Sequence, residues 1–213
     1  MDSEARFLSH HDTMRLMAQA GQRARLPMAY TGGFNPRPRL SLPLPRPVGI
    51  AGRSELLVLE LAEPADAADA VGRLARQMPE ELSLLGPTAL PGRRAPQAEA
   101  ADYELTIAPQ AAAALADRLE ELAGQPQWPC TRQDGHHAYR RLELRELVKG
   151  LAFDGRALSF TLAPQGQIWA RVDEVLALLH LPATDRAGVT RTAIRWRPQG
   201  EDPGIPATNG TKD

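Results

Sequence analysis

A short arginine-bearing segment near the start of the chain holds the residues best suited to bind a ligand. In Gly33-Phe34-Asn35-Pro36-Arg37-Pro38-Arg39, prolines flank Arg37 on both sides and stiffen the backbone, which lowers the entropy lost on binding. Guanidinium groups pair with phosphate, and an aromatic ring stacks on an unstacked base. The segment therefore predicts a rigid loop that presents Phe34, Arg37 and Arg39 to a phosphate- or base-bearing ligand. The alternative is a structural edge connection, with Phe34 in the core and Asn35 capping a turn.

The surrounding sequence is strongly basic. Residues 5–53 contain eight arginines and one acidic residue, Asp12, so this stretch has a local net charge of about +7 although the whole chain has a formal net charge of −1. The net charge argues against a wholly basic nucleic-acid binder but is compatible with a local basic surface. Arg15 either contributes to that surface or is simply solvated.

Two adjacent histidines are the best candidates for proton transfer. His10 and His11 follow Ser9, where the positive end of a helix favours a neutral imidazole that accepts a proton. With Tyr30 and arginines nearby, His10 is a weak candidate for a general base in RNA cleavage. Binding of a ligand or partner by His10, or packing of its ring against a sheet, are the alternatives.

The other reactive residues predict no metal or cofactor site. Cys130, His136 and His137 lack a fourth ligand at a suitable spacing, and the single cysteine excludes an internal disulfide. The chain contains no phosphate-binding glycine loop and no nucleophile elbow. The sequence thus predicts a binding protein more than an enzyme.

The first half of the chain predicts alternating helices and strands. Ser9 caps a helix, with Asp12 at the capping-box position and Pro27 as its end. The inner face of this helix is predicted to carry Met14, Met17, Ala18 and Gly21. Further elements are predicted at residues 28–30 (strand), 54–61 (strand), 65–77 (helix) and 81–85 (strand).

The second half repeats the same order. Strands are predicted at residues 103–108, 128–132, 141–153, 157–163 and 189–197, and helices at 110–122 and 172–181. Asp154-Gly155 is a hairpin turn. Val175, Leu176 and Leu179 are predicted to be buried, as are Ile194 and Trp196.

The fold class predicted is α+β, with two tandem ferredoxin-like (βαββαβ) lobes. The lobes span residues 1–90 and 101–197, joined by a linker at 91–100 and followed by a disordered tail at 198–213. The first lobe lacks an opening strand, which is central in such a sheet. Three explanations stay open: the natural start lies upstream, a partner donates the strand, or residues 3–8 pair weakly.

The N-terminal motifs resemble those of the radical SAM-linked protein family, a bacterial domain of uncharacterised function fused to or encoded beside radical SAM proteins. The residues that carry the resemblance are Phe7, Leu8, Ser9, His10, Asp12, Met14 and Arg15, followed by Gly33, Phe34, Asn35, Pro36, Pro38, Arg39 and Ser41. It covers about 45 residues densely and continues loosely to Trp196. The chain departs from the family pattern in two places. His11 stands where the family usually has an apolar residue, and the leading strand is absent.

The resemblance implies a radical SAM protein as partner. Such enzymes hold a [4Fe–4S] cluster with three closely spaced cysteines, and this chain has one cysteine in all, so its role would be that of an accessory. We expect a cytoplasmic, non-catalytic protein that binds RNA, related to tRNA or translation, or the radical SAM partner. The ligand-binding residues would be His10, Arg15, Tyr30, Phe34, Asn35, Arg37 and Arg39. A metal-independent endoribonuclease using His10 and a purely structural subunit are the alternatives, and no membrane association is expected.

Overall fold

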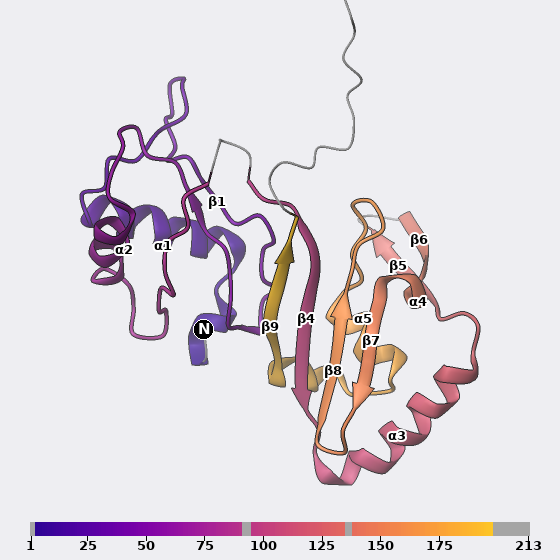
Figure 1. Ribbon diagram of the computed structural model, residues 1–213. Helices are drawn as coiled ribbons and strands as arrows, with labels where there is room; N and C mark the ends of the chain where they lie inside the picture. Colours follow the sequence, from indigo (N-terminus) through magenta and orange to yellow (C-terminus); the bar gives the residue numbers. More distant parts are fainter. Residues whose placement is uncertain (1–2, 91–94, 135–137, 198–213) are drawn as a thin grey trace, which may run out of the picture.

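The computed structural model describes residues 3–90, 95–134 and 138–197 (Figure 1). The chain mixes helices and strands in two halves that lie side by side, here called the N-terminal half (residues 3–90) and the C-terminal half (residues 95–197). The tail predicted at 198–213 lies outside the described residues.

One antiparallel sheet organises the C-terminal half. The strands β4 (Ala98–Thr106), β7 (Val148–Phe153), β8 (Ala157–Leu162) and β9 (Val189–Trp196) lie in the order β9-β4-β8-β7. Helix α3 (Pro109–Gly124) follows β4, and α5 (Val172–Leu178) precedes β9 after the β7–β8 hairpin. Apart from an inserted hairpin, this half therefore has the predicted β-α-β-β-α-β order.

The predicted hairpin at Asp154-Gly155 is present. The Asp154 carboxylate accepts hydrogen bonds from the backbone N–H groups of Arg156 (2.8 Å) and Ala157 (2.6 Å), and Gly155 has a φ of 92°, which favours glycine. These contacts fix the register of β7 against β8.

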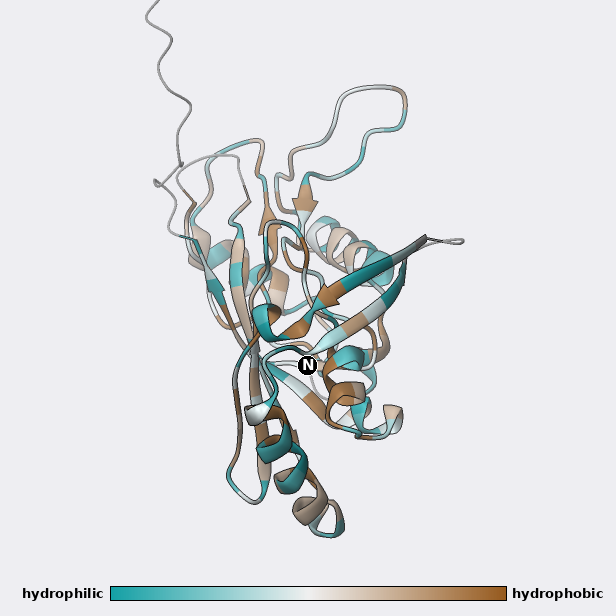
Figure 2. Ribbon diagram, turned by 90° about the vertical axis from the view of Figure 1, so that its right-hand side faces the viewer, coloured by the Kyte–Doolittle hydropathy of each residue, from teal (hydrophilic) through white to brown (hydrophobic). Residues whose placement is uncertain are grey.

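The strand predicted over residues 141–153 divides into three elements. Its first part belongs to β6 (Ala138–Glu143), which pairs with β5 (Pro129–Asp134) in a separate two-stranded sheet. A single helical turn, α4 (Leu144–Leu147), then turns the chain into β7. Figure 2 shows the β5–β6 hairpin projecting from the main sheet.

The first strand of the C-terminal half begins within the predicted linker. β4 starts at Ala98, which pairs with Trp196 of β9. Ala98, Ala100 and Ala101 are buried, because small side chains allow close packing where the strand lies between two neighbours. Alanine has a low strand propensity, so tertiary pairing decides the conformation here.

The main core lies between this sheet and its helices. Tyr103 and Phe160 stack on neighbouring strands with ring centroids 5.3 Å apart. Val175, Leu176 and Leu179 are buried, as predicted, whereas Ile194 and Trp196 are only half-buried. A register shift between Asp102 and Tyr103 in the pairing of β4 with β9 changes which β9 residues face the core.

The N-terminal half contains no four-stranded sheet within its described residues, so the tandem ferredoxin-like arrangement is not confirmed. Its sheet has two short strands, β1 (Leu40–Ser41) and β3 (Val58–Leu59). The strand predicted at residues 28–30 is reduced to isolated bridges, and that predicted at 81–85 forms no strand. Residues 3–8 do not pair as a strand, because η1 (Ser3–Phe7) is a 3-10 helix. The predicted strands did not form because a strand needs a neighbour with which its backbone groups can pair.

The two halves share one backbone ladder. β2 (Ala51–Gly52) runs parallel to β9, with Ala51 opposite Thr190 and Gly52 opposite Arg191. The N-terminal half thereby adds a fifth strand to the edge of the main sheet, in the order β2-β9-β4-β8-β7.

Helix α1 (His10–Arg23) begins as predicted. Ser9 is the N-cap, and its hydroxyl accepts a hydrogen bond from the Asp12 backbone N–H (3.1 Å) and donates one to the Asp12 carboxylate (2.6 Å). The bond from Ser9 lowers the pKa of Asp12. Of the predicted inner face only Gly21 is fully buried, whereas Met14, Met17 and Ala18 are half-buried. The other buried residues of the helix are Thr13 and Ala20.

The end of α1 is set by hydrogen bonds rather than by Pro27. The Leu26 N–H donates to the Gly21 carbonyl (3.1 Å) and the Arg25 N–H to the Gln22 carbonyl (2.9 Å), which is a Schellman motif. Arg73 of α2 (Ala67–Ala75) donates to the carbonyls of Ala24 and Arg25. A cation thus satisfies the negative end of α1 and joins the two helices.

Arg25 itself is strained, because its φ is 52° and glycine is the residue usually found at this position. His180, which follows α5, has a φ of 57° in an equivalent motif. We expect Arg25→Gly and His180→Gly each to raise the free energy of unfolding by about 1 kcal/mol, measured by urea denaturation. Gln19→Gly, on the exposed face of α1, is the control and should lower it by about 1 kcal/mol. Destabilisation by all three would contradict the prediction.

Candidate functional site

The predicted arginine-bearing segment forms a narrow β-hairpin, here called the finger (residues 29–39). The Thr31 N–H donates to the Arg37 carbonyl (2.9 Å), and the Arg39 N–H donates to the Ala29 carbonyl (2.8 Å). The Thr31 hydroxyl accepts a third bond, from the Arg37 N–H (3.0 Å). In Figure 1 the segment between α1 and β1 stands out from the N-terminal half.

The tip of the finger is fully open. Residues 31–37 are all exposed, and Phe34 has a relative solvent exposure of 105%. Gly33 has a φ of 103°, a backbone conformation that favours glycine and lets the chain reverse at this point. The interpretation that Phe34 fills the core is therefore wrong: its ring faces solvent.

The finger carries cations and no acidic side chain. Arg37 is exposed, and no described carboxylate forms an ion pair with it. Arg39 is held at the base, where its Nε donates to the Tyr30 carbonyl (3.1 Å) and its Nη1 lies 3.5 Å from a Glu60 carboxylate oxygen. Its side chain keeps 43% exposure, so it can exchange this loose pair for an anion. Asn35 is exposed beside the tip.

One face of α1 continues the finger surface. Gln22 donates a hydrogen bond to the Tyr30 hydroxyl (3.3 Å), which fixes the base of the finger against the last turn of the helix. Arg15 and Gln19 precede Gln22 at helical spacing and are also exposed. The structure thus brings Arg15, Tyr30 and the finger onto one side of the N-terminal half.

His10 lies apart from these residues. It stands at the first turn of α1, twelve residues before Gln22, which corresponds to about 18 Å along the helix axis. Its ring lines a cavity of the N-terminal half, and its buried Nδ1 has no hydrogen-bond partner among the described residues. The structure does not bring His10 together with Tyr30 and the finger arginines.

Two arginines of the basic stretch use their terminal Nη groups to hold backbone carbonyls of the chain itself, so they do not add to the finger surface. Arg46 donates to the carbonyls of Ala5 (2.9 Å), Arg6 (2.7 Å) and Ile50. Arg6 donates to the carbonyl of Ala187 (2.6 Å) in the C-terminal half. The positive charge counted in the sequence therefore does not lie on one surface.

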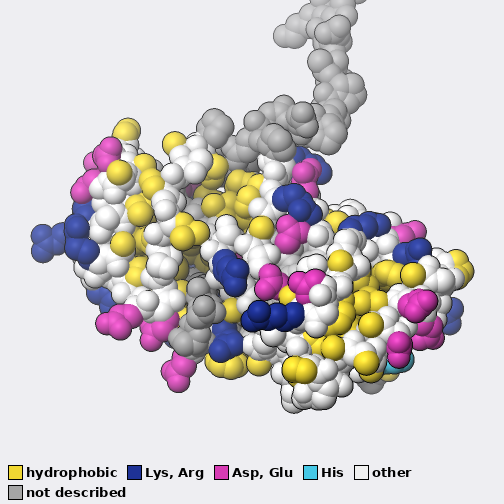
Figure 3. All heavy atoms as spheres, turned by 60° about the horizontal axis from the view of Figure 1, so that its bottom comes forward, with side chains coloured by type: hydrophobic (Ala, Val, Ile, Leu, Met, Phe, Trp, Pro, Cys, Tyr) yellow, Lys and Arg dark blue, Asp and Glu magenta, His cyan; other side chains and the backbone are white. Residues whose placement is uncertain are grey.

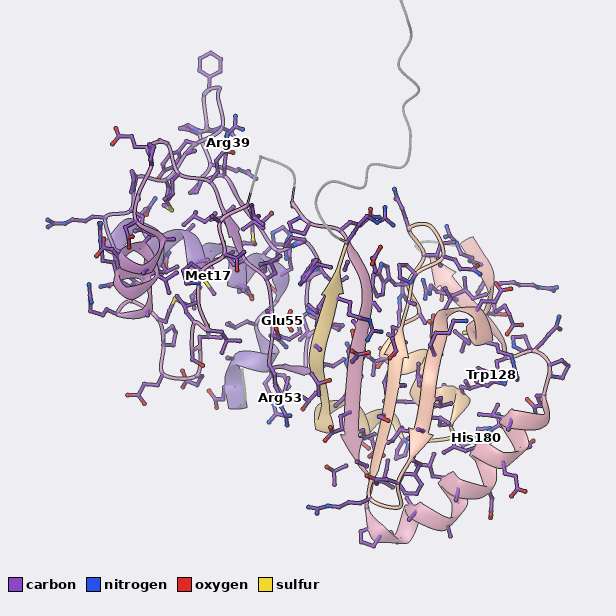
Figure 4. The ribbon with its side chains drawn as sticks, in the orientation of Figure 1. Met17, Arg39, Arg53, Glu55, Trp128 and His180 are labelled. Atoms are coloured by element: carbon purple, nitrogen blue, oxygen red, sulfur yellow. The ribbon has the colours of Figure 1, made fainter. Side chains whose placement is uncertain are left out.

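Arg191 is the main residue that sequence analysis missed. It is 1% exposed, forms a two-pronged ion pair with Glu55, and donates to the Leu44 carbonyl (3.0 Å). Burial opposes its charge, but hydrogen bonding and attraction to Glu55 outweigh that cost and raise the pKa of Arg191. Figure 4 shows Glu55 beside β9, so this pair joins the two halves. The available signal was its alternation with Val189 and Ala193, which places Arg191 on the same face of the strand as these two apolar residues.

No group of metal-ligating side chains occurs among the described residues. Cys130 is partly buried, and burial together with the nearby Glu174 raises the pKa of its thiol. His136 and His137 lie outside the described residues. Within the part of the chain that the structure describes, no helix is long and apolar enough to cross a membrane.

Comparison with known proteins gives a family but no activity. No curated protein and no solved structure matches the chain. A family model described as "Uncharacterized protein conserved in bacteria (DUF2344)" matches residues 2–174, which include α1, the finger and most of the C-terminal half. That description names no partner, ligand or reaction. The chain belongs to this bacterial family of uncharacterised proteins.

Proposed function

We propose that this protein is a non-catalytic accessory that binds single-stranded RNA through the finger and the adjoining face of α1. The observation that carries the proposal is the complete exposure of Phe34 at the tip of a hairpin whose charged side chains are all arginines. An exposed aromatic ring next to arginines suits RNA, because the ring stacks on a base while guanidinium groups pair with phosphates. The hydrogen bonds at the finger base reduce the ordering cost of binding.

The biochemical setting of this binding is also part of the proposal. The resemblance of the N-terminal motifs to radical SAM-linked proteins supports a radical SAM protein as the enzyme that this chain assists, on tRNA or another translation-related RNA. The single cysteine agrees with an accessory role, since the [4Fe–4S] cluster of a radical SAM enzyme needs three cysteines.

The endoribonuclease alternative has less support. A general base must lie within hydrogen-bond reach of the proton that it removes, and His10 is separated from the finger by most of α1. Incubation of RNA with the wild type and with His10→Ala, in the presence of a chelator, tests this alternative. Intact RNA in both samples is the expected result, whereas cleavage by the wild type alone would favour the nuclease.

Phe34→Ala is expected to weaken the binding of a fluorescent single-stranded oligoribonucleotide by about 1–3 kcal/mol, through lost base stacking. The dependence of affinity on salt should stay unchanged, because no phosphate contact is removed. Tyr139→Ala is the matched control, since Tyr139 is also an exposed aromatic residue (71%) but lies on β6. Equal loss in both variants, or no loss in either, would contradict the finger as the RNA contact.

Arg37→Ala should act differently from Phe34→Ala. Removing one phosphate contact is expected to reduce the slope of log affinity against log salt by about 0.7 for a single strand. Arg156→Ala, at the exposed β7–β8 turn, is the control and should leave the slope unchanged. Fluorescence anisotropy at several salt concentrations measures both slopes. An unchanged slope for Arg37→Ala would mean that the finger does not contact phosphate.

A further inference from the structure

The two-stranded sheet of the N-terminal half has an open edge. The Glu60 N–H donates to the Arg39 carbonyl (2.9 Å), and the Glu60 carbonyl accepts from the Ala29 N–H (2.8 Å). The Ala62 N–H donates to the Pro27 carbonyl (2.7 Å), so the backbone groups of residues 58, 60 and 62 face β1 and the finger base. Because alternate residues of a strand direct their backbone groups to opposite edges, residues 57, 59 and 61 face the other way. No described residue forms a backbone hydrogen bond with these three on that side.

A second unpaired segment lines the same space. Residues 83–90 form no backbone hydrogen bond with any other described residue. Together with β3, α1 and α2 they line an open cavity of about 780 Å³. Its apolar lining includes Met17, Leu57, Leu59, Leu74, Leu84 and Leu90. Figure 3 shows hydrophobic side chains reaching the surface over this half.

The cavity is partly open to solvent, because most residues of the 83–90 wall are exposed. Its volume alone would suit a small apolar ligand. The unpaired backbone groups along both walls distinguish a small apolar ligand from an extended polypeptide as the occupant. Every backbone N–H and C=O group must be hydrogen-bonded when it is covered. An extended polypeptide satisfies both walls, and a small apolar molecule satisfies neither.

Charge at one end of the cavity indicates the chemistry of the occupant. His10, Arg46 and Arg53 line that end, where the Glu55 carboxylate is already held by Arg191. The buried Arg46 Nε and His10 Nδ1 have no hydrogen-bond partner among the described residues. Figure 4 places Arg53 and Glu55 at the opposite end of this half from Arg39. A carboxylate on the occupant would complement these groups.

We propose that this cavity receives a β-strand donated by another polypeptide, apolar at alternate positions and acidic at the end beside Arg46 and Arg53. The added strand pairs with residues 57–61 on one side and with residues 83–90 on the other, so that it completes the sheet by β-augmentation. This inference goes beyond the proposed RNA binding and does not depend on it, because the finger lies outside the cavity lining except for Arg39.

A fused strand tests the proposal without knowledge of the natural partner. A segment of alternating valine and threonine that ends in glutamate is joined ahead of Met1 by a short Gly/Ser linker, which keeps its effective concentration high. Arg46 binds the carbonyls of Ala5 and Arg6, so these two residues lie at the basic end. Controls carry a proline in the middle of the added strand, or lysine in place of the glutamate.

The readouts are amide hydrogen exchange and the melting temperature. The added strand should slow exchange at residues 57, 59 and 61 by at least about tenfold and raise Tm by about 3 °C or more. The proline control should do neither, and the lysine control should give a smaller Tm rise. Equal amide exchange rates at residues 57, 59 and 61 in the fusion with the intact strand and in the proline control would overturn the proposal.

A cavity variant separates specific docking from general stabilisation. Leu84→Arg places a charge in the cavity wall, where Leu84 is half-buried and packs against the core of the N-terminal half, so the melting temperature of this variant without the added strand first checks that it folds. In the fused protein the substitution should abolish the protection given by the added strand. Tyr139→Arg, on the C-terminal half, should keep it. Protection that survives Leu84→Arg, or a small apolar dye that binds equally well with and without the fused strand, would show that the cavity is not a strand acceptor. RNA affinity should be the same in both variants.

Discussion

Arg191→Ala is expected to lower the free energy of unfolding by about 3–5 kcal/mol, the usual result of removing one partner from a buried ion pair. Glu55 keeps its negative charge at a site where its side chain is only 18% exposed, and the Leu44 carbonyl loses its donor. Urea denaturation followed by tryptophan fluorescence measures the change, since Trp128, Trp169 and Trp196 all lie in the C-terminal half.

Two further variants show that the loss comes from the pair. Arg191→Met combined with Glu55→Gln should cost clearly less than Arg191→Ala alone, because no buried charge is left unpaired. Arg195→Ala removes an arginine of the same strand whose side chain is 56% exposed in its pair with Asp102, and it should cost at most about 1 kcal/mol. If Arg191→Ala cost no more than Arg195→Ala, the proposed connection between the halves would be wrong.

Glu174→Gln should destabilise the C-terminal half by about 2 kcal/mol at neutral pH. Glu174 forms a two-pronged ion pair with Arg132 (2.6 and 2.7 Å) and accepts a hydrogen bond from the Arg171 N–H (2.7 Å) at the start of α5. The two side chains of the pair are 11% and 9% exposed. Glutamine keeps one acceptor but loses the charge that balances Arg132.

The effect of Glu174→Gln should depend on pH in a defined direction. Burial alone would raise the pKa of Glu174, but the hydrogen bonds from Arg132 and the Arg171 backbone outweigh it and lower that pKa. The ionised carboxylate therefore stabilises the fold above the unfolded-state pKa of about 4.3, and this contribution is lost as the pH falls through the lower folded-state value. The difference between wild type and variant should shrink on acidification.

Glu121→Gln provides the matched control for this measurement. Glu121 pairs with Arg118 on α3, but its side chain is 58% exposed, so the pair is well solvated and contributes little. Denaturation curves at neutral and acidic pH should differ little between this variant and the wild type. A pH-independent loss in Glu174→Gln would assign the effect to packing rather than to charge.

The proposed RNA contact and the proposed strand acceptor use different parts of the N-terminal half. The finger offers an exposed aromatic ring and arginines, whereas the cavity offers unpaired backbone and leucines. An accessory protein that meets both an RNA and a protein partner needs two such surfaces. The finger variants and the cavity variants can therefore fail independently of each other.

Local chemistry in the sequence was sufficient to predict several features. Ser9 caps α1, Asp154-Gly155 turns the β7–β8 hairpin, and the second half of the chain follows the predicted order of elements. These features depend on residues close together in the chain, where a side chain bonds the neighbouring backbone or a glycine permits a turn. For the finger, the glycines and prolines predicted a rigid loop and left a structural edge connection open, and the hairpin geometry and exposure came from the structure.

Only the tertiary structure decided which charges are buried and which strands find partners. Arg191, Arg46 and Arg37 cannot be told apart by residue type, yet the first two are internal hydrogen-bond donors and Arg37 is exposed at the surface. β2, where no strand was predicted, pairs with a strand about 140 residues later in the chain, whereas residues 81–85, which were predicted as a strand, form none. Strand formation and charge burial both require a partner in space, and a single sequence does not state where that partner lies.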